Sequence, residues 1–138
     1  NNRSQRTETA RNTLVADCYN ANPLSMRLAV ESFLAEPLGR RQRRVLILGD
    51  MLELGEWSAH EHTEIIRQAA QSPDAELLLV GSEFTQACTS LPEKPARTTL
   101  CPTREELLSR LRLSPVENAL VLLKGSRGIG LEKAIPEL

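Results

Sequence analysis

The stretch Thr13–Met26, TLVADCYNANPLSM, decides the fold expected of this chain. Its first four residues are an apolar run suited to a buried strand. Apolar side chains then recur at the spacing of a helix with one buried face, at Met26, Ala29, Val30, Phe33 and Leu34. The residues between these two segments therefore predict a loop that joins a strand to a helix. This loop carries Asp, Tyr and two Asn, which packing alone would not require.

The same strand-then-helix pattern continues along the chain. Apolar, strand-like runs occur at 13–16, 45–48, 77–80, 98–100 and 119–123, and a helix-like segment follows each of them. Residues suited to begin these helices are Asn22 with Pro23, Ser58 with Glu61, Ser82, and Thr103 with Glu106. A last helix is predicted over 131–138. Five such units predict an α/β fold, a Rossmann-like three-layer sandwich in which helices cover both faces of a mostly parallel sheet.

Composition narrows the possible function classes. The 138 residues fit one domain, and 17 Lys and Arg against 18 Asp and Glu give a net charge of -1. No overall field would therefore attract nucleic acid or an anionic membrane. The three cysteines, Cys18, Cys88 and Cys101, are an odd number without ligand-like spacing, so we expect a reduced, cytoplasmic protein. No apolar run is long enough to span a membrane.

Three polar loops are expected to share one edge of the sheet. In open α/β sheets, ligands bind beyond the carboxyl ends of the strands. The loops that follow the first, second and fifth strands are polar and contain Asn or Gly, whereas the strand exits at Gly81 and Cys101 are short. We therefore expect a binding site along this rim.

The first two loops allow structural as well as functional readings. Asp17 is suited to accept hydrogen bonds from ribose hydroxyls or to hold a cation, and it is also suited to cap its own loop. Asn22 either caps the following helix or contributes to the site. Asp50, Glu53 and Glu56 of the second loop fit a solvated acidic turn as well as a binding loop.

The third loop combines Lys124 and Arg127 with three glycines and the start of a helix, which suits a phosphate or carboxylate. It matches neither the phosphate-binding P-loop nor the dinucleotide fingerprint. The basic run 40–44 has no interleaved aromatic residues and predicts a solvated loop. His60 and His62 lack a further ligand nearby, so no metal site is expected.

Three motifs carry a resemblance to a known family. The segments Asp17–Met26 (DCYNANPLSM), Leu48–Gly55 (LGDMLELG) and Leu123–Gly128 (LKGSRG) resemble the C-terminal domain of the Mur ligases, in the branch that uses D-alanyl-D-alanine. The resemblance runs from Arg3 to about Glu132. It departs at Cys18, where Ser or Ala is common, and at Leu24, where a small polar residue is usual.

The resemblance implies a division of the chain. Residues 1–12 would be a hinge or linker from a missing upstream ATPase domain, and 13–138 would be the Mur ligase C-terminal domain. The chain contains no G-x-x-x-x-G-K-[ST] sequence. We therefore expect it to be inactive alone and to work with the upstream domains as one wall of a cleft that closes by hinge motion.

The resemblance also implies an activity. Such a ligase uses ATP and Mg²⁺, held mostly by the central domain, to join D-alanyl-D-alanine to UDP-N-acetylmuramoyl-tripeptide in peptidoglycan precursor synthesis. The residues implied for nucleotide binding are Arg3, Asp17, Tyr19, Asn20 and Asn22. Those implied for substrate binding are Asp50, Lys124, Ser126 and Arg127, with Asp50 either binding the dipeptide ammonium or ordering its loop.

Other readings stay open from the sequence alone. One is a free-standing module that binds a nucleotide or anion, for which the third loop and the Rossmann-like order would suffice. Another is a different Mur-type amino acid ligase. We expect a monomer with small-molecule substrates and no nucleic-acid partner.

Overall fold

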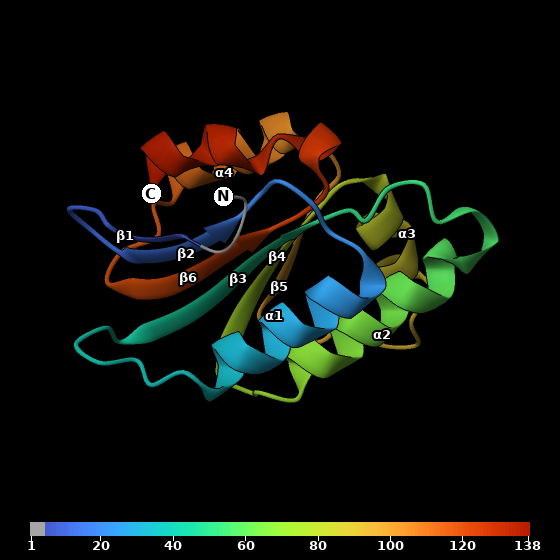
Figure 1. Ribbon diagram of the computed structural model, residues 1–138, viewed down its shortest axis with the longest axis horizontal. Coiled ribbons are helices and arrows are strands. Elements are labelled where there is room, and N and C mark those ends of the chain that lie inside the picture. The colour runs from blue at the N-terminus through green and yellow to red at the C-terminus, as the bar shows by residue number, and fades with distance from the viewer. Residues whose placement is uncertain (1–4) are drawn as a thin grey trace.

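The computed structural model describes residues 5–138 and contains one six-stranded sheet (Figure 1). Its spatial order is β1-β2-β6-β3-β4-β5. Strands β2 to β6 run parallel and β1 pairs antiparallel with β2. The strands are β1 (Gln5–Glu8), β2 (Thr13–Asp17), β3 (Arg43–Gly49), β4 (Ala75–Val80), β5 (Thr98–Cys101) and β6 (Ala119–Lys124). The expected mostly parallel α/β sheet is confirmed.

Helices cover both faces of this sheet (Figure 1). On one face lie α1 (Pro23–Ala35), α2 (Ser58–Ala70) and α3 (Ser82–Thr89), and on the other lie α4 (Arg104–Leu113) and the 3₁₀ helix η3 (Leu131–Glu137). Two shorter 3₁₀ turns are η1 (Gly55–Trp57) and η2 (Arg127–Ile129).

Alternation along the central strand divides the core into two clusters. Leu46 and Leu48 of β3 pack with α1, α2 and α3, whereas Val45 and Ile47 pack with α4 and η3. Successive side chains of a strand point to opposite faces, so a continuous apolar run serves both layers. The three-layer sandwich follows from this arrangement.

The edge strand β1 lies within residues 1–12, for which the sequence predicts a linker rather than a strand. All four of its residues are exposed, and it is held by backbone pairing with β2, from Gln5 opposite Ala16 to Glu8 opposite Thr13. A polar sequence without an apolar face gave no strand signal. The hinge role of 1–12 stays a prediction, and residues 1–4 lie outside the described part of the chain.

Two of the predicted helix caps are confirmed. The Asn22 side chain accepts a hydrogen bond from the backbone N–H of Ser25, with Pro23 as the first helical residue. The side chain of Thr103 accepts from the N–H of Glu106 in the same way.

The caps predicted at Ser58 and Ser82 are wrong. Helix α2 is preceded by Trp57, and the hydroxyl of Ser58 donates instead to Glu83. Ser82 is already helical, and a carboxylate from a distant loop caps its helix. The last segment is a 3₁₀ helix rather than an α-helix, and it contains Pro136, which has no N–H to donate.

The basic run 40–44 is more firmly anchored than a solvated loop. The side chain of Arg41 is only 9% exposed, and it donates to Glu8 and to Thr13. Arg43 forms two hydrogen bonds with Glu76, and the guanidinium of Arg44 lies over the ring of Phe33. Carboxylates and carbonyls that are distant in sequence account for this anchoring.

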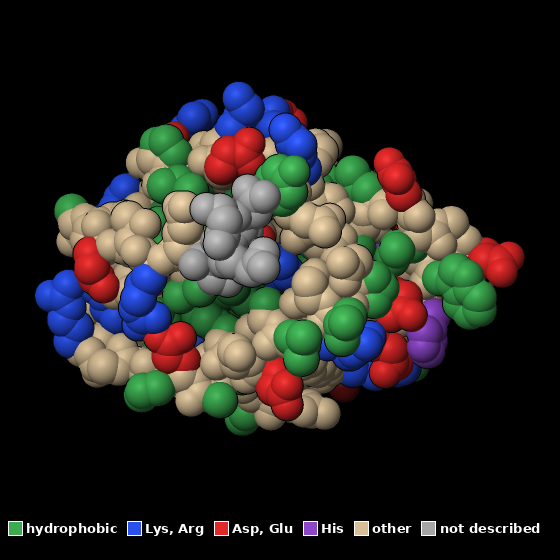
Figure 2. All heavy atoms as spheres, viewed as in Figure 1, with side chains coloured by type: hydrophobic (Ala, Val, Ile, Leu, Met, Phe, Trp, Pro, Cys, Tyr) green, Lys and Arg blue, Asp and Glu red, His purple; other side chains and the backbone are tan. Residues whose placement is uncertain are grey.

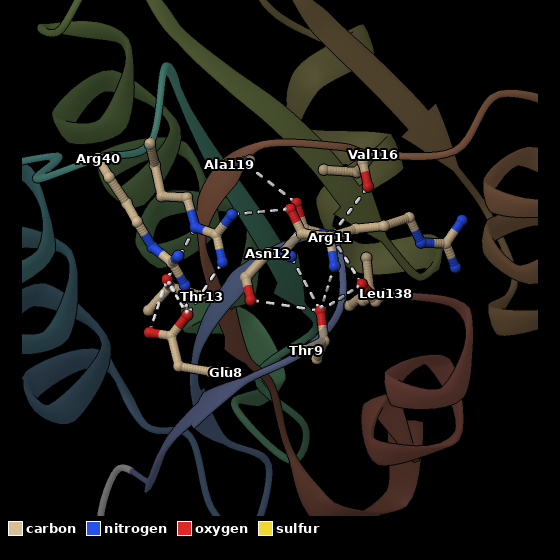
Figure 3. A network of polar contacts seen from close by, with 10 residues as sticks. Glu8, Thr9, Arg11, Asn12, Thr13, Arg40, Val116, Ala119 and Leu138 are labelled. Atoms are coloured by element: carbon tan, nitrogen blue, oxygen red, sulfur yellow. Dashed lines mark hydrogen bonds and ion pairs between the residues drawn. The ribbon is translucent and has the colours of Figure 1, made fainter.

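A buried asparagine ties the start of the sheet to the end of the chain (Figure 3). Asn12 is fully buried, and its amide nitrogen donates to the carbonyls of Val116 and Leu138 at 2.8 and 2.7 Å. Its amide oxygen accepts from the N–H of Ala119 at 3.0 Å. The hydroxyl of Thr9 also donates to the Leu138 carbonyl. The entry to β2, the entry to β6 and the C-terminal helix are thus held by one side chain.

We predict that Asn12→Ala lowers the free energy of unfolding by about 3 kcal/mol, because three buried hydrogen bonds are lost and only the Leu138 carbonyl keeps another partner, Thr9. Urea denaturation of the chain would measure it. Gln71→Ala, an exposed substitution just after α2, should stay within about 0.5 kcal/mol of the parent. Equal stability of the two variants would contradict the role assigned to Asn12.

Candidate functional site at the carboxyl ends of the strands

The three polar loops lie on one rim, as expected. Strands β2, β6 and β3 are neighbours in the sheet, and their carboxyl ends are in register, with both Asp17 and Leu48, the penultimate residue of β3, opposite Lys124. The loops that follow these strands leave on the same side of the sheet (Figure 1). Their side chains therefore meet at the carboxyl edge.

An ion pair lies at the centre of this rim. The ammonium of Lys124 lies 2.6 Å from Oδ2 of Asp17 and donates to the carbonyl of Asn20 at 3.0 Å. The Lys124 side chain is 2% exposed and that of Asp17 is 18% exposed. A lysine at the end of a fully buried strand needs such partners, because an unpaired buried charge is costly. Lys124 therefore fixes the first loop, and its ammonium is already engaged.

Tyr19 and Arg127 connect the first and third loops above this pair. The guanidinium carbon of Arg127 lies 5.0 Å from the centre of the Tyr19 ring, a cation–π arrangement. Tyr19 is 47% exposed. The stacking holds the guanidinium at the surface of the rim, where its N–H groups can reach an anion.

The third loop is joined to the second by Ser126 and by a close backbone approach. The hydroxyl of Ser126 accepts from the N–H of Leu52 at 2.9 Å. The backbone N–H of Ser126 donates to the carbonyl of Asp50 at 3.0 Å. A Cβ added to Gly125 would lie 2.8 Å from Cα of Gly49. Ser126 thus joins two loops, and only glycine fits before it.

Asp50 lies beneath the rim and caps helix α3. Its two carboxylate oxygens accept from the N–H groups of Glu83 and Phe84 at 2.9 and 2.8 Å. Burial raises the pKa of Asp50, while these two hydrogen bonds act in the opposite direction. Gly81 permits the contact, because a Cβ there would lie 2.3 Å from the carboxylate. Of the two roles implied for Asp50, these contacts match the ordering of its loop.

The neutral form of His62 supports the second loop from inside. Its Nε2 accepts from the N–H of Met51 at 3.0 Å, so Nδ1 carries the proton and donates to the carbonyl of Ser58 at 2.8 Å. Within residues 5–138, no group of three or more His, Cys, Asp or Glu side chains is placed to hold a metal ion.

Cys18, one of the departures from the family pattern, is half-buried beside this site. Burial, with smaller contributions from the charges of Glu132 and Asp17, raises the pKa of its thiol to about 11. The residue is therefore a neutral thiol at pH 7, with little nucleophilic character.

A pocket of about 630 Å³ opens between this rim and helix α1. It lies on the side shown in Figure 2, where hydrophobic side chains line a hollow between the strands and the helix. The volume is within the range typical of small-molecule sites. Its lining combines rim residues, Asp17, Tyr19, Asn20 and Lys124, with strand and helix residues, Val15, Leu122, Ser25, Leu28, Ala29, Ser32, Phe33 and Glu36.

The helical wall of this pocket was not predicted. The apolar spacing of α1 predicts a packing helix, and its core-facing stripe does contain Met26, Val30 and Phe33. Leu28, which is 54% exposed, lies outside the fully buried part of that stripe. An apolar residue off the core-facing stripe was the available signal for a second surface on this helix.

Comparison with known proteins agrees with these features. The family model described as "Mur ligase, glutamate ligase domain" matches residues 2–127. The chain belongs to the Mur ligase family. It is 35% identical over 127 residues to the UDP-N-acetylmuramoyl-tripeptide--D-alanyl-D-alanine ligase of Escherichia coli, a match that covers 91% of this chain and 26% of that protein.

Solved structures of Mur ligases share the fold. A crystal structure of MurF from Acinetobacter baumannii matches with a TM-score of 0.80 and 27% identity, covering 99% of this chain and 30% of that one. MurF ligase from Thermotoga maritima, solved in complex with ADP, matches with a TM-score of 0.71 and 23% identity, again over 99% of this chain and 30% of that one. The chain thus spans about 30% of the length of these solved ligases.

In this Mur ligase domain the implied site residues separate into two layers. Tyr19, Asn20 and Arg127 lie at the surface of the rim, above the pair of Asp17 and Lys124. Asn22 caps α1, while Asp50 and Ser126 hold the loops together beneath. Arg3 lies outside the described residues.

We predict that Gly125→Ala destabilises the domain by about 1–3 kcal/mol, because the new methyl group would press the ends of β6 and β3 apart. Gly128→Ala is the matched control, since among residues 5–138 its Cβ would meet only the flexible end of Leu52, at 3.0 Å. Thermal unfolding of both variants would measure this difference. Equal melting temperatures would show that the rim is not closely packed at Gly125.

Proposed function

We propose that this chain is the C-terminal domain of an ATP-dependent ligase that adds D-alanyl-D-alanine to UDP-N-acetylmuramoyl-tripeptide. The observation that carries the proposal is the convergence of the three family motifs on one rim, beside a pocket of ligand size. The names of the curated relatives support the choice of substrates. As part of peptidoglycan precursor synthesis, the enzyme is expected in the cytoplasm.

The nucleotide would approach the outer part of the rim. Lys124 engages Oδ2 of Asp17, so the geometry leaves Oδ1 for a ribose hydroxyl. Tyr19 and Asn20 line the same pocket. The ADP named in the Thermotoga maritima structure supports a nucleotide as the ligand of that relative. Arg3 and Asn22 belong to the same proposal through the family motif.

Magnesium does not fit the residues of this domain. Residues 5–138 bring no cluster of metal-ligating side chains together, and the carboxylate of Asp17 is already paired with a cation. Since ligation with ATP requires charge neutralisation on the phosphates, the Mg²⁺ ligands are expected in an upstream domain. The sheet and helices α1 to α4 would then form one wall of a cleft between this domain and the upstream domains.

The incoming dipeptide would meet Arg127. Its guanidinium is held at the surface by Tyr19, and a guanidinium can bind a free carboxylate through two parallel hydrogen bonds. Lys124 would act indirectly by fixing Asp17, and Ser126 and Asp50 by ordering the loops. Of the four residues implied for substrate binding, we thus propose a direct contact with the dipeptide for Arg127 alone. Asp50, Lys124 and Ser126 already have partners within the protein.

The proposed reaction proceeds through an activated carboxylate. The γ-phosphoryl group of ATP is transferred to the terminal carboxylate of the tripeptide, and the amine of D-alanyl-D-alanine then attacks the acyl phosphate. The tetrahedral intermediate collapses to an amide and releases phosphate. The domain contributes positioning and exclusion of water as it closes on the upstream domains, and we propose that the enzyme acts as a monomer.

The test uses the full-length protein that contains this chain. Phosphate release from Mg-ATP and UDP-N-acetylmuramoyl-tripeptide should require D-alanyl-D-alanine. Arg127→Ala should raise the KM for the dipeptide about tenfold or more and change the KM for ATP far less, because it removes a charge-assisted contact to the carboxylate.

Arg67→Ala is the matched control, since this exposed arginine on α2 forms an ion pair with Glu64 and with no other carboxylate among residues 5–138. Its kinetic constants should equal those of the parent. Phosphate release that responds to a single amino acid instead of the dipeptide would indicate another Mur-type ligase. No release with any acceptor would favour a nucleotide-binding or anion-binding module.

A further inference from the structure

A second pocket lies at the opposite end of the sheet. It has a volume of about 590 Å³ and is bounded by the amino ends of β3, β4 and β5, the segment 94–97 and the end of α4. The seven residues of β3 run from this pocket to the rim, and a strand of that length spans about 20 Å. In Figure 1 the rim loops leave from the other end of these strands. The proposed ligase activity gives this pocket no role.

The walls of this pocket carry an excess of positive charge. Arg43, Lys94, Arg97 and Arg110 line it, together with one carboxylate, Glu76. The chain as a whole has a net charge of -1. A concave surface with this local excess concentrates the field and attracts anions.

Among the described residues, Glu76 forms an ion pair with one of these four cations, Arg43. Glu76 binds Arg43 through two hydrogen bonds of 2.8 and 2.9 Å, which lower the pKa of Glu76 and keep it ionised. Among residues 5–138, no carboxylate forms an ion pair with Lys94, Arg97 or Arg110. In the described part of the chain, three exposed cationic side chains therefore line the pocket without an ion-pair partner.

The backbone of Arg97 adds an independent observation. Its φ is 59°, in the left-handed region that is unfavourable for a residue with a long side chain. The N–H of Leu77 donates to the Arg97 carbonyl at 2.9 Å and holds this conformation. Glycine or asparagine would adopt this conformation more readily, so Arg97 lies at the pocket in a backbone conformation that carries an energetic cost.

Apolar side chains complete the walls. Leu77, Leu78, Leu111 and Val116 line the pocket, and Thr98 and Thr99 lie there as well. The four apolar side chains are themselves buried, so they form the floor of the pocket beneath the exposed cations. Guanidinium groups match phosphate oxygens in geometry as well as charge.

We propose that this pocket, lined by Lys94, Arg97 and Arg110, is a binding site for a phosphate-bearing small anion, separate from the rim. The phosphate can come from an inorganic polyphosphate or from a nucleotide, and both sources present the same charged oxygens. Binding here does not depend on the proposed ligase function.

The test is a titration of the ¹⁵N-labelled 138-residue chain with inorganic pyrophosphate at constant ionic strength, followed by amide chemical shifts. Pyrophosphate should shift the amides of Thr98, Thr99 and Ser114. A parallel titration with ADP distinguishes the source, because a nucleotide site would bind ADP more tightly than pyrophosphate at these same amides.

The variant Arg97→Gly with Arg110→Ala should weaken pyrophosphate binding about tenfold or more. Glycine suits the left-handed conformation at 97, so the variant should remain folded. Arg67→Ala is the control for a general loss of positive charge, and it should leave the affinity unchanged. Pyrophosphate shifts confined to the amides of Lys124 and Gly125, or equal weakening in the control, would overturn the proposal.

Discussion

The ion pair between Lys124 and Asp17 is the interaction on which the rim depends. Lys124 ends a strand whose residues are all buried, so its charge must be satisfied within the protein. Its two partners, the carboxylate of Asp17 and the carbonyl of Asn20, both belong to the loop after β2. The end of β6 therefore sets the path of the neighbouring loop, and with it the position of Tyr19.

Close packing beneath the pair makes the rim a single unit. Gly125 and Gly49 allow β6 and β3 to approach, and Ser126 binds the backbone of the second loop. Asp50 connects that loop to helix α3. The polar residues of the motifs thus serve two purposes, since some order the loops and others, above all Tyr19 and Arg127, are presented to solvent.

The architecture was accessible from sequence because local patterns determine it. The apolar runs 45–48 and 119–123 are long enough to be buried on both faces, and Asn22 followed by Pro23 begins a helix by local chemistry alone. The division of roles within the rim was not accessible. In the sequence, Lys124 and Arg127 are equally suited to bind an anion. The strand register is needed to show that Lys124 lies opposite Asp17. Strand β1 was not predicted because it has no apolar face, and backbone pairing with β2 and polar contacts of Glu8 with residues distant in sequence hold it.

A double-mutant cycle on Asp17 and Lys124 tests the central claim most directly, with unfolding free energies measured in urea for Asp17→Asn, Lys124→Met and the double variant. The account predicts that each single variant loses roughly 3–5 kcal/mol, because the remaining partner is left in an unfavourable environment. The double variant should lose clearly less than the sum, by at least about 1 kcal/mol. Additive losses would contradict the account, since the two residues would then stabilise the rim independently.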